Sequence, residues 1–382
     1  MSLTGEVTAA HNRLMHGKRA LRTRDDIPHS YESITSEWLT AVICADVSDA
    51  VIVNHKLDTP DDGTSNRRRI YLEYNEAGTV RGLPASVFCK AAFDVKNKIL
   101  LAHTCGPLLE RVFYSQVRSR LDIEAPRALY AAYDPKSFTG LIILEDLRGK
   151  VSFCDEKTKM SRQRAESQLR LLAALHGHYF QSPEFANSLE DVMFWPDRFH
   201  RMASFHLRDI CEAGFRAAKD VLPPELFARE SEVWPATLNA VERHRVLPQT
   251  LTHGDVHLKN WYVTKGGEMG LSDWQALTRG HWSRDIAYAI SCALEVEDRR
   301  AWEADLIRYY LDRLGTEGGP KVTFDEAWLN YRQQLLHALA WWTGTLTPTP
   351  DMPDMQPQET AIEFIRRFGA AINDHHALDS FS

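Results

Sequence analysis

The stretches His253-Gly-Asp-Val-His-Leu-Lys-Asn260 and Leu271-Ser-Asp273 decide how this sequence is interpreted. They are connected by strand-like runs that flank Lys265-Gly-Gly-Glu268, a sequence typical of a tight turn, so the region predicts a β-hairpin. The returning strand would bring Asp273 back toward Asn260. Because Asn and Asp side chains offer the oxygen ligands that Mg²⁺ prefers, we expect these two residues to form a magnesium site.

Asp255 stands five residues before Asn260, directly after a glycine. The Asp-x-x-x-x-Asn spacing is that of the catalytic loop of protein kinases. A carboxylate in this place can accept a hydrogen bond from a substrate hydroxyl and align it with the γ-phosphorus of ATP. Asp255 is therefore the predicted catalytic residue, and ATP and Mg²⁺ are the predicted cofactors.

Three other interpretations of this region are open. His253, Asp255 and His257 alternate along the chain, so they could share one side of a strand and bind the metal of a metal-dependent hydrolase. The downstream Asn260 and Asp273 would then have no role. The region could also be an ordinary polar hairpin, or it could belong to a nucleotide-binding protein without catalytic activity.

Composition and charge restrict the class of protein. The 382 residues are 44% hydrophobic and 25% charged, as in ordinary globular proteins, and the length allows a two-lobed enzyme. A net charge of −7 disfavours general nucleic-acid binding, which needs a basic surface. We expect neither a secretory signal nor a membrane span, because no sufficiently long apolar run occurs. The six cysteines are scattered without a Cys-x-x-Cys pair, which favours a reducing, cytoplasmic environment.

Hydrophobic periodicity and turn residues predict an α+β fold. An N-terminal antiparallel sheet of five strands with one helix precedes a larger, mostly helical part that contains the hairpin. The strands are expected at residues 49–57, 68–74, 85–93, 128–133 and 140–147, with the helix at 108–121. Further helices are expected at residues 35–39, 161–180, 302–314, 324–343 and 359–373, and a loop at 345–356.

Several motifs resemble those of one enzyme superfamily. The stretch at 253–260 resembles the "Brenner" motif of aminoglycoside phosphotransferases and choline kinases, and Ser272-Asp273-Trp274 resembles their metal-binding segment. The stretch at 281–287 is similar to the element whose Asp, here Asp285, braces the catalytic loop. The resemblance covers roughly residues 33–370, nearly all of this chain. Within the superfamily it is closest to the ecdysteroid kinase-like branch, through residues 37–39, 86–90, 110–114 and 144–147.

The resemblance implies a protein kinase-like fold of two lobes. Residues 1–32 would be an N-terminal extension, 33–147 the nucleotide-binding lobe and 148–382 the catalytic and acceptor-binding lobe. It also implies roles that the residues alone do not establish. Lys90 would pair with the α- and β-phosphates of ATP and Glu110 would hold Lys90. Glu145 and Leu147 would meet the adenine through backbone groups, with Leu144 guarding the pocket.

Residues 75–86 depart from the expected pattern, because they contain no Gly-x-Gly-x-x-Gly. Gly78 and Gly82 remain candidates for bending a loop over the phosphates. The sequence therefore predicts an ATP- and Mg²⁺-dependent small-molecule kinase that moves the γ-phosphate to a hydroxyl. The resemblance points to an apolar, sterol- or lipid-like acceptor. Neither the acceptor's identity nor the oligomeric state follows from the sequence.

Overall fold

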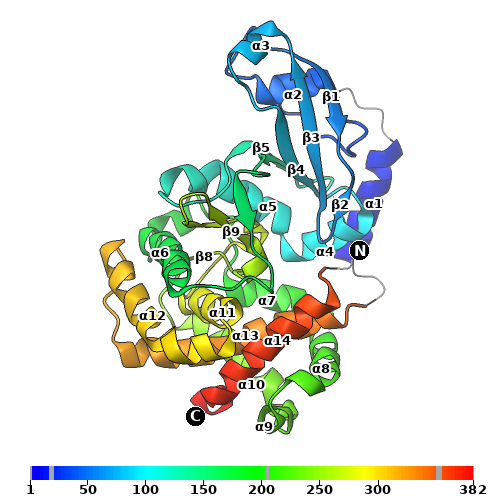
Figure 1. Cartoon of the computed structure of the whole chain (residues 1–382). Coiled ribbons are helices and arrows are strands. Elements are labelled where there is room, and N and C mark those ends of the chain that lie inside the picture. Colours follow the sequence, from blue (N-terminus) through cyan, green and yellow to red (C-terminus); the bar gives the residue numbers. More distant parts are fainter. Residues whose placement is uncertain (1, 17–20, 204–205, 350–354, 382) are drawn as a thin grey trace. The chain divides into compact units, whose positions relative to one another are not determined.

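The computed structural model describes residues 2–16, 21–203, 206–349 and 355–381, and the chain forms two compact units (Figure 1). The first contains Met1–Arg118 and Pro126–Arg148, and the second contains Ser119–Ala125, Gly149–Pro350 and Met355–Ser382. An antiparallel sheet dominates the first unit and helices dominate the second. The predicted α+β class is therefore confirmed.

The sheet of the first unit contains all five predicted strands. Its order is β1-β3-β4-β6-β5, and every neighbouring pair is antiparallel. A sixth strand, β2, pairs with β3 and escaped prediction because it is only two residues long. The strands are β1 (Ile52–Leu57), β2 (Asp61–Asp62), β3 (Asn66–Tyr74), β4 (Ser86–Ala91), β5 (Ala128–Asp134) and β6 (Thr139–Glu145).

This unit contains more helices than the two expected at residues 35–39 and 108–121. The helices are α1 (Leu3–His16), α2 (Ser36–Ile43), α3 (Glu76–Val80), α4 (Val95–Thr104) and α5 (Gly106–Val112). The segment around Gly78 was expected to be part of a loop, but it forms α3. The Asn75 side chain caps this helix by accepting a hydrogen bond from the Gly78 N–H at 3.1 Å. The predicted helix at 108–121 begins as α5 and ends in a π turn and a 3₁₀ turn.

The two faces of this sheet have different surroundings. Trp38 of α2 and Tyr130 of β5 meet edge to face at 5.5 Å, within a cluster that also buries Cys89 of β4. Thr35 caps α2 by accepting a hydrogen bond from the Trp38 N–H at 3.1 Å. Side chains alternate along a strand, so Lys90 lies on the face opposite to Cys89.

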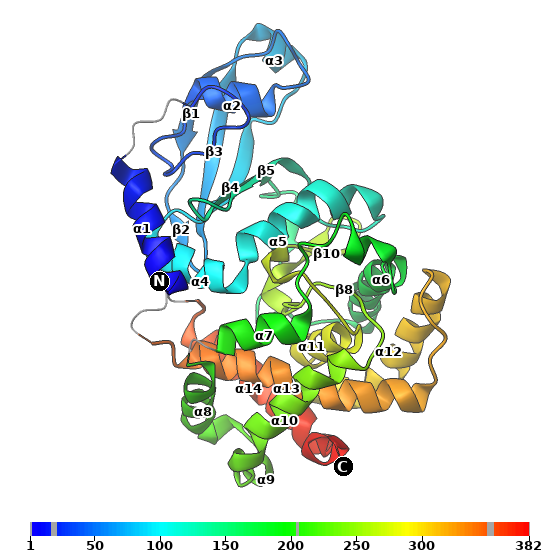
Figure 2. The ribbon, with the colours of Figure 1, turned by 180° about the vertical axis from the view of Figure 1, so that it is seen from behind.

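Long helices build the second unit, and α13 lies at its centre. It packs against α8, α10, α11 and α14 (Figure 2). The helices at α6, α12, α13 and α14 confirm the prediction, although α12 starts six residues earlier than expected. The nine helices here are α6 (Arg162–His178), α7 (Trp195–Ala203), α8 (Leu207–Ala217), α9 (Pro224–Phe227), α10 (Glu230–Glu242), α11 (Ser283–Ala293), α12 (Val296–Thr316), α13 (Phe324–Leu346) and α14 (Gln358–Asp374), counted over the described residues.

Two small antiparallel sheets carry the predicted hairpin. One has the order β10-β9-β7 and the other pairs β11 with β8. Their strands are β7 (Val151–Phe153), β8 (Thr250–Thr252), β9 (Trp261–Thr264), β10 (Met269–Leu271) and β11 (Thr278–Gly280). The predicted loop at 345–356 starts inside α13, and its residues 350–354 lie outside the described residues. Among the helices that the structure describes, none has the length and apolar character needed to cross a bilayer.

Candidate active site

The β9–β10 hairpin brings Asn260 and Asp273 together. Leu271 pairs with Trp261, and the ladder is extended by Ser272, whose backbone N–H and Oγ both donate to the Asn260 carbonyl, at 2.8 and 2.9 Å. Asp273 follows directly on the returning chain. The sequence prediction that these two residues meet at the open end of one hairpin is thus realised by the strand register.

Asp273 has an unusual backbone conformation, with φ 62° and ψ 70°. Few residues other than glycine adopt a positive φ, although Asp tolerates it better than most. Trp274 fixes the chain immediately afterwards, because its Nε1 donates to the Leu271 carbonyl at 3.1 Å and its ring lies 4.6 Å from that of His253. Strained residues of this kind persist where the surrounding structure over-determines them, often at functional sites.

Asp255 is held at both carboxylate oxygens. Tyr288 donates to Oδ1 at 3.1 Å, while Oδ2 lies 3.4 Å from Asn260 Nδ2 and 3.5 Å from His257 Nε2. Burial raises the pKa of Asp255, but the charge and hydrogen bond of His257 outweigh it and hold this pKa well below its usual range. The carboxylate is therefore ionised at neutral pH and is a weak base, which suits orienting a hydroxyl better than early proton removal.

Asp285 braces the loop from below, as the resemblance implied. It is completely buried and accepts from the backbone N–H of His253 at 2.7 Å and of Gly254 at 2.9 Å. His176 contacts the same carboxylate at 3.2 Å. Burial raises the pKa of Asp285, but the hydrogen bond from His176 helps to keep it below the usual value. A buried carboxylate thus replaces the helix or strand partners that these loop N–H groups lack.

Arg284 holds the same loop and was missed by the sequence analysis. Its Nη2 donates to the Gly254 carbonyl at 3.0 Å and its Nη1 to Thr278 Oγ1 at 2.8 Å. The guanidinium also lies 3.5 Å from the centre of the Trp195 ring. Its position next to Asp285 in the sequence could have indicated this role, because two consecutive residues at the start of α11 can contact the loop from two sides.

The ring of His253 is fully occupied by the protein. Its Nδ1 accepts from the Asp255 N–H at 3.2 Å, so Nε2 carries the proton and donates to the Ser272 carbonyl at 3.0 Å. A metal at His253, Asp255 and His257 would need a nitrogen that these bonds already use. Within the described parts of the chain, no group of three His, Cys, Asp or Glu residues is placed to hold a metal ion. The hydrolase alternative gains no support.

Lys90 and Glu110 are brought together in the first unit. The Lys90 Nζ lies 3.1 Å from Glu110 Oε1 and 3.0 Å from Oε2, and both side chains are buried. Lys90 comes from the middle of β4 and Glu110 from α5. Burying a lysine is costly unless it is paired, and this bidentate contact supplies the partner that the sequence analysis assigned.

Glu145 and Leu147 lie at and just beyond the end of β6. The Glu145 N–H donates to the Arg127 carbonyl at 2.9 Å, whereas the Leu147 N–H has no partner among the described residues. Between them, Asp146 is fixed by Arg69 and Ser86, each at 2.6 Å. Of the two residues predicted to contact the adenine, only Leu147 has a backbone N–H that can still donate a hydrogen bond to a ligand.

The model of the phosphotransferase enzyme family matches residues 110–323, which is more than half of the 382-residue chain. The chain belongs to this family. The match starts at Glu110 and includes Asp255, Asn260 and Asp273. Membership establishes phosphoryl transfer as the class of reaction and leaves the acceptor and the roles of individual residues open.

Solved structures resemble the phosphotransferase distantly. A choline kinase from Streptococcus pneumoniae is 11% identical with a TM-score of 0.48, over 88% of this chain and 98% of that one. An ethanolamine kinase from Plasmodium vivax is 11% identical with a TM-score of 0.48, over 97% and 94% of the two chains. A putative aminoglycoside phosphotransferase from Ralstonia eutropha is 14% identical with a TM-score of 0.49, over 84% and 92%. Such distant likenesses say nothing about the acceptor. No curated protein matches the sequence.

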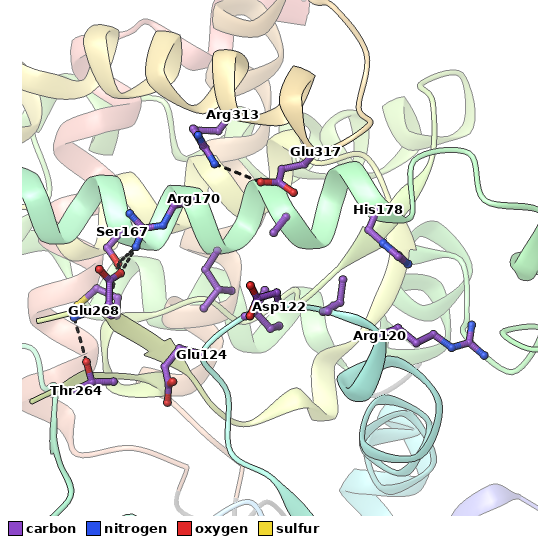
Figure 3. Close-up of a pocket in the computed structure, with 15 residues that line it drawn as sticks. Arg120, Asp122, Glu124, Ser167, Arg170, His178, Thr264, Glu268, Arg313 and Glu317 are labelled. Carbon is purple, nitrogen blue, oxygen red and sulfur yellow. Dashed lines mark hydrogen bonds and ion pairs between the residues drawn. The ribbon is translucent and has the colours of Figure 1, made fainter. Parts of the chain in front are cut away.

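A cavity of about 660 Å³ opens elsewhere on the second unit of the phosphotransferase (Figure 3). It is lined by residues 120–124, by α6, by the turn end of the β9–β10 hairpin and by the end of α12, and none of the predicted site residues lines it. Figure 3 shows two ion pairs among its lining residues, Arg170 with Glu268 and Arg313 with Glu317. The cavity therefore lies apart from the predicted chemistry.

Asp285→Asn is expected to lower the free energy of unfolding of the phosphotransferase by about 1 to 3 kcal/mol. An amide presents only one oxygen, so one of the two loop N–H groups loses its acceptor. Urea unfolding followed by circular dichroism measures the change. Asp312→Asn is the matched control, because this exposed carboxylate on α12 makes no hydrogen bond or ion pair with the residues that the structure describes. Equal stabilities of the two variants would contradict the bracing role.

Proposed function

We propose that this phosphotransferase moves the γ-phosphate of ATP to a hydroxyl group of a small molecule in a Mg²⁺-dependent reaction. The observation that carries the proposal is the geometry of the hairpin loop, in which Asn260 contacts Asp255 and the strand register brings Asp273 next to Asn260. The loop is fixed from below by Asp285 and Arg284. Phosphoryl transfer depends mainly on positioning and charge stabilisation, so a rigid polar loop of this kind fits its needs.

In the second unit, Asp255 orients the acceptor hydroxyl and Asn260 and Asp273 hold Mg²⁺. The donor set fits a hard ion, because the Asn260 Nδ2 donates to the Asp255 carbonyl at 2.8 Å and so turns its Oδ1 away from that bond. That oxygen and the Asp273 carboxylate are the ligand types that Mg²⁺ takes in kinases. When bound, Mg²⁺ neutralises charge on the phosphates.

In the first unit, Lys90 contacts the α- and β-phosphates while Glu110 holds it in place. Glu145 and Leu147 meet the adenine, with the available N–H of Leu147 supporting this assignment. Residues 33–147 act as the nucleotide-binding lobe and 148–382 as the catalytic and acceptor-binding lobe, with 1–32 as an N-terminal extension.

The acceptor is a hydroxyl-bearing and largely apolar molecule, as in the ecdysteroid kinase-like branch. The motifs at residues 37–39, 86–90, 110–114 and 144–147 support this placement.

The test is a screen of hydroxylated compounds, sterols included, with ATP and Mg²⁺ and detection of phosphorylated product by mass. A product that needs both cofactors supports the proposal. Stabilisation of the protein against heat by ATP, without product from any compound, would favour an inactive nucleotide-binding protein instead. Release of inorganic phosphate without ATP from simple esters would favour a hydrolase.

Lys90→Met is expected to reduce kcat/KM for ATP by about 10²-fold, on the order of a lost charge-stabilising contact. The variant is also destabilised by about 3 to 5 kcal/mol, because the buried carboxylate of Glu110 loses the ammonium group that balances its charge. The double variant Lys90→Met/Glu110→Leu separates the two effects, since it restores stability without restoring the phosphate contact. Steady-state kinetics and urea unfolding measure both quantities. Recovery of activity in the double variant would contradict the role of Lys90.

A further inference from the structure

Tyr288 and Trp342 form a directed hydrogen-bond chain that ends at Asp255. Trp342 Nε1 lies 2.7 Å from the Tyr288 hydroxyl, which in turn lies 3.1 Å from Asp255 Oδ1. An indole N–H can only donate, so the Tyr288 oxygen must accept from Trp342. Its own proton is then directed to Asp255. The donor-only indole N–H therefore sets the direction of donation in this hydrogen-bond chain, from Trp342 on α13 through Tyr288 on α11 to Asp255 in the loop.

The chain is rigid because both rings are packed. Tyr288 is 1% exposed and lies 5.7 Å from the His337 ring and 5.4 Å from the Phe368 ring. Trp342 is 3% exposed and packs on Phe364 at 4.6 Å. A buried hydroxyl is tolerated only where it finds partners, and here it has one donor and one acceptor.

The two oxygens of Asp255 are held unequally. The neutral hydroxyl of Tyr288 contacts Oδ1, whereas the contacts of Oδ2 to Asn260 and His257 are longer, at 3.4 and 3.5 Å. The Asp255 side chain is still 29% exposed. The contact at Oδ1 therefore limits rotation of the carboxylate, and the exposed part of the carboxylate can accept a further hydrogen bond.

We propose that Tyr288, itself held by Trp342, is a positioning residue that sets the orientation of Asp255 for the acceptor hydroxyl. The inference rests on the proposed kinase function. It also gives α11 a double task, because Tyr288 lies three residues after Asp285 on the same side of the helix. Asp285 binds the backbone of the loop, and Tyr288 orients the carboxylate of Asp255 within it.

The test compares Tyr288→Phe, Trp342→Phe and the double variant in the full-length protein, with ATP, Mg²⁺ and an acceptor from the screen. Tyr288→Phe is expected to lower kcat by about 10- to 100-fold, the worth of a hydrogen bond to a charged group, while KM for ATP stays within about twofold. Trp342→Phe gives a smaller fall. The double variant falls no further than Tyr288→Phe alone, because Trp342 acts through the Tyr288 hydroxyl.

Tyr331→Phe is the matched control. Tyr331 is also a buried tyrosine, and its hydroxyl contacts Ser291 and Glu303 rather than the loop. This variant is expected to lose stability and keep its kcat. Falls in kcat that multiply in the Tyr288/Trp342 double variant, or a Tyr288→Phe variant with normal kcat, overturn the inference.

Crystal structures of the wild type and of Tyr288→Phe add a readout that needs no turnover. The Asp255 carboxylate is expected to be rotated in the variant relative to the wild type. The same carboxylate orientation in both structures overturns the inference, whatever the activity. If the wild type phosphorylates no hydroxyl, the proposed function fails while the positioning of Asp255 is still tested by these structures.

Discussion

Asp255→Asn is expected to lower kcat by about 10²- to 10⁴-fold, the range for loss of a group that takes part in proton transfer. The amide keeps the size of the side chain and can still accept from Tyr288 at one oxygen, so the loop remains folded. It loses the negative charge that attracts the acceptor proton. KM for ATP is expected to change little, since Asp255 acts on the acceptor.

Steady-state kinetics with varied ATP and acceptor measure this result, and Asp312→Asn serves as the control for removing one carboxylate from the second unit. Full activity in a folded Asp255→Asn variant would rule out the catalytic assignment. A fall confined to KM for ATP would move Asp255 to nucleotide binding.

Gly254→Ala is expected to lower the free energy of unfolding by about 2 to 5 kcal/mol, combining left-handed strain with overpacking. Gly254 has φ +82°, and a Cβ built there would lie 2.6 Å from the Ala276 carbonyl oxygen and 2.9 Å from both terminal nitrogens of Arg284. Relief of this clash displaces the residue before Asp255. We expect activity to fall by about 10²-fold or more, because catalysis is sensitive to displacements near 1 Å.

Gly267→Ala separates the two causes. Gly267 has φ +88° in the hairpin turn, but nothing lies within 4 Å of a Cβ at this position. This variant carries the left-handed strain alone, so we expect a loss of about 1 to 2 kcal/mol with activity retained. Urea unfolding measures the free energy of unfolding of both variants, and steady-state kinetics measure their activity. Equal destabilisation would contradict the close packing of Gly254 beneath the loop.

The sheet of the first unit was largely predictable because its signals are local. β-branched and aromatic residues alternate over short runs that end in turn residues, and this pattern located all five longer strands. The loop expected around Gly78 was a wrong prediction. Asn75 precedes it, and asparagine both starts turns and caps helices, so the sequence does not distinguish the two. The two-residue β2 carries no pattern long enough to read.

The sequence by itself determined the parts of the candidate site that depend on spacing along the chain. Asn260 and Asp273 could be placed near each other because a hairpin fixes how the residues at the ends of its strands meet, and Asp255 followed from its spacing to Asn260. Lys90 and Glu110 followed from order along the chain and a resemblance. Family membership then gave the chain its class of reaction, phosphoryl transfer.

Only the tertiary structure revealed the contacts of Arg284 and Tyr288 with this loop. Tyr288 and Trp342 are 54 residues apart, and Arg284 meets Trp195 across a still longer separation. In the sequence these are ordinary aromatic and charged residues within helices, with the same pattern that core filling produces. A hydrogen bond between distant segments produces no periodic pattern in the sequence. It depends on how the helices pack against each other and not on the spacing of residues within any one helix.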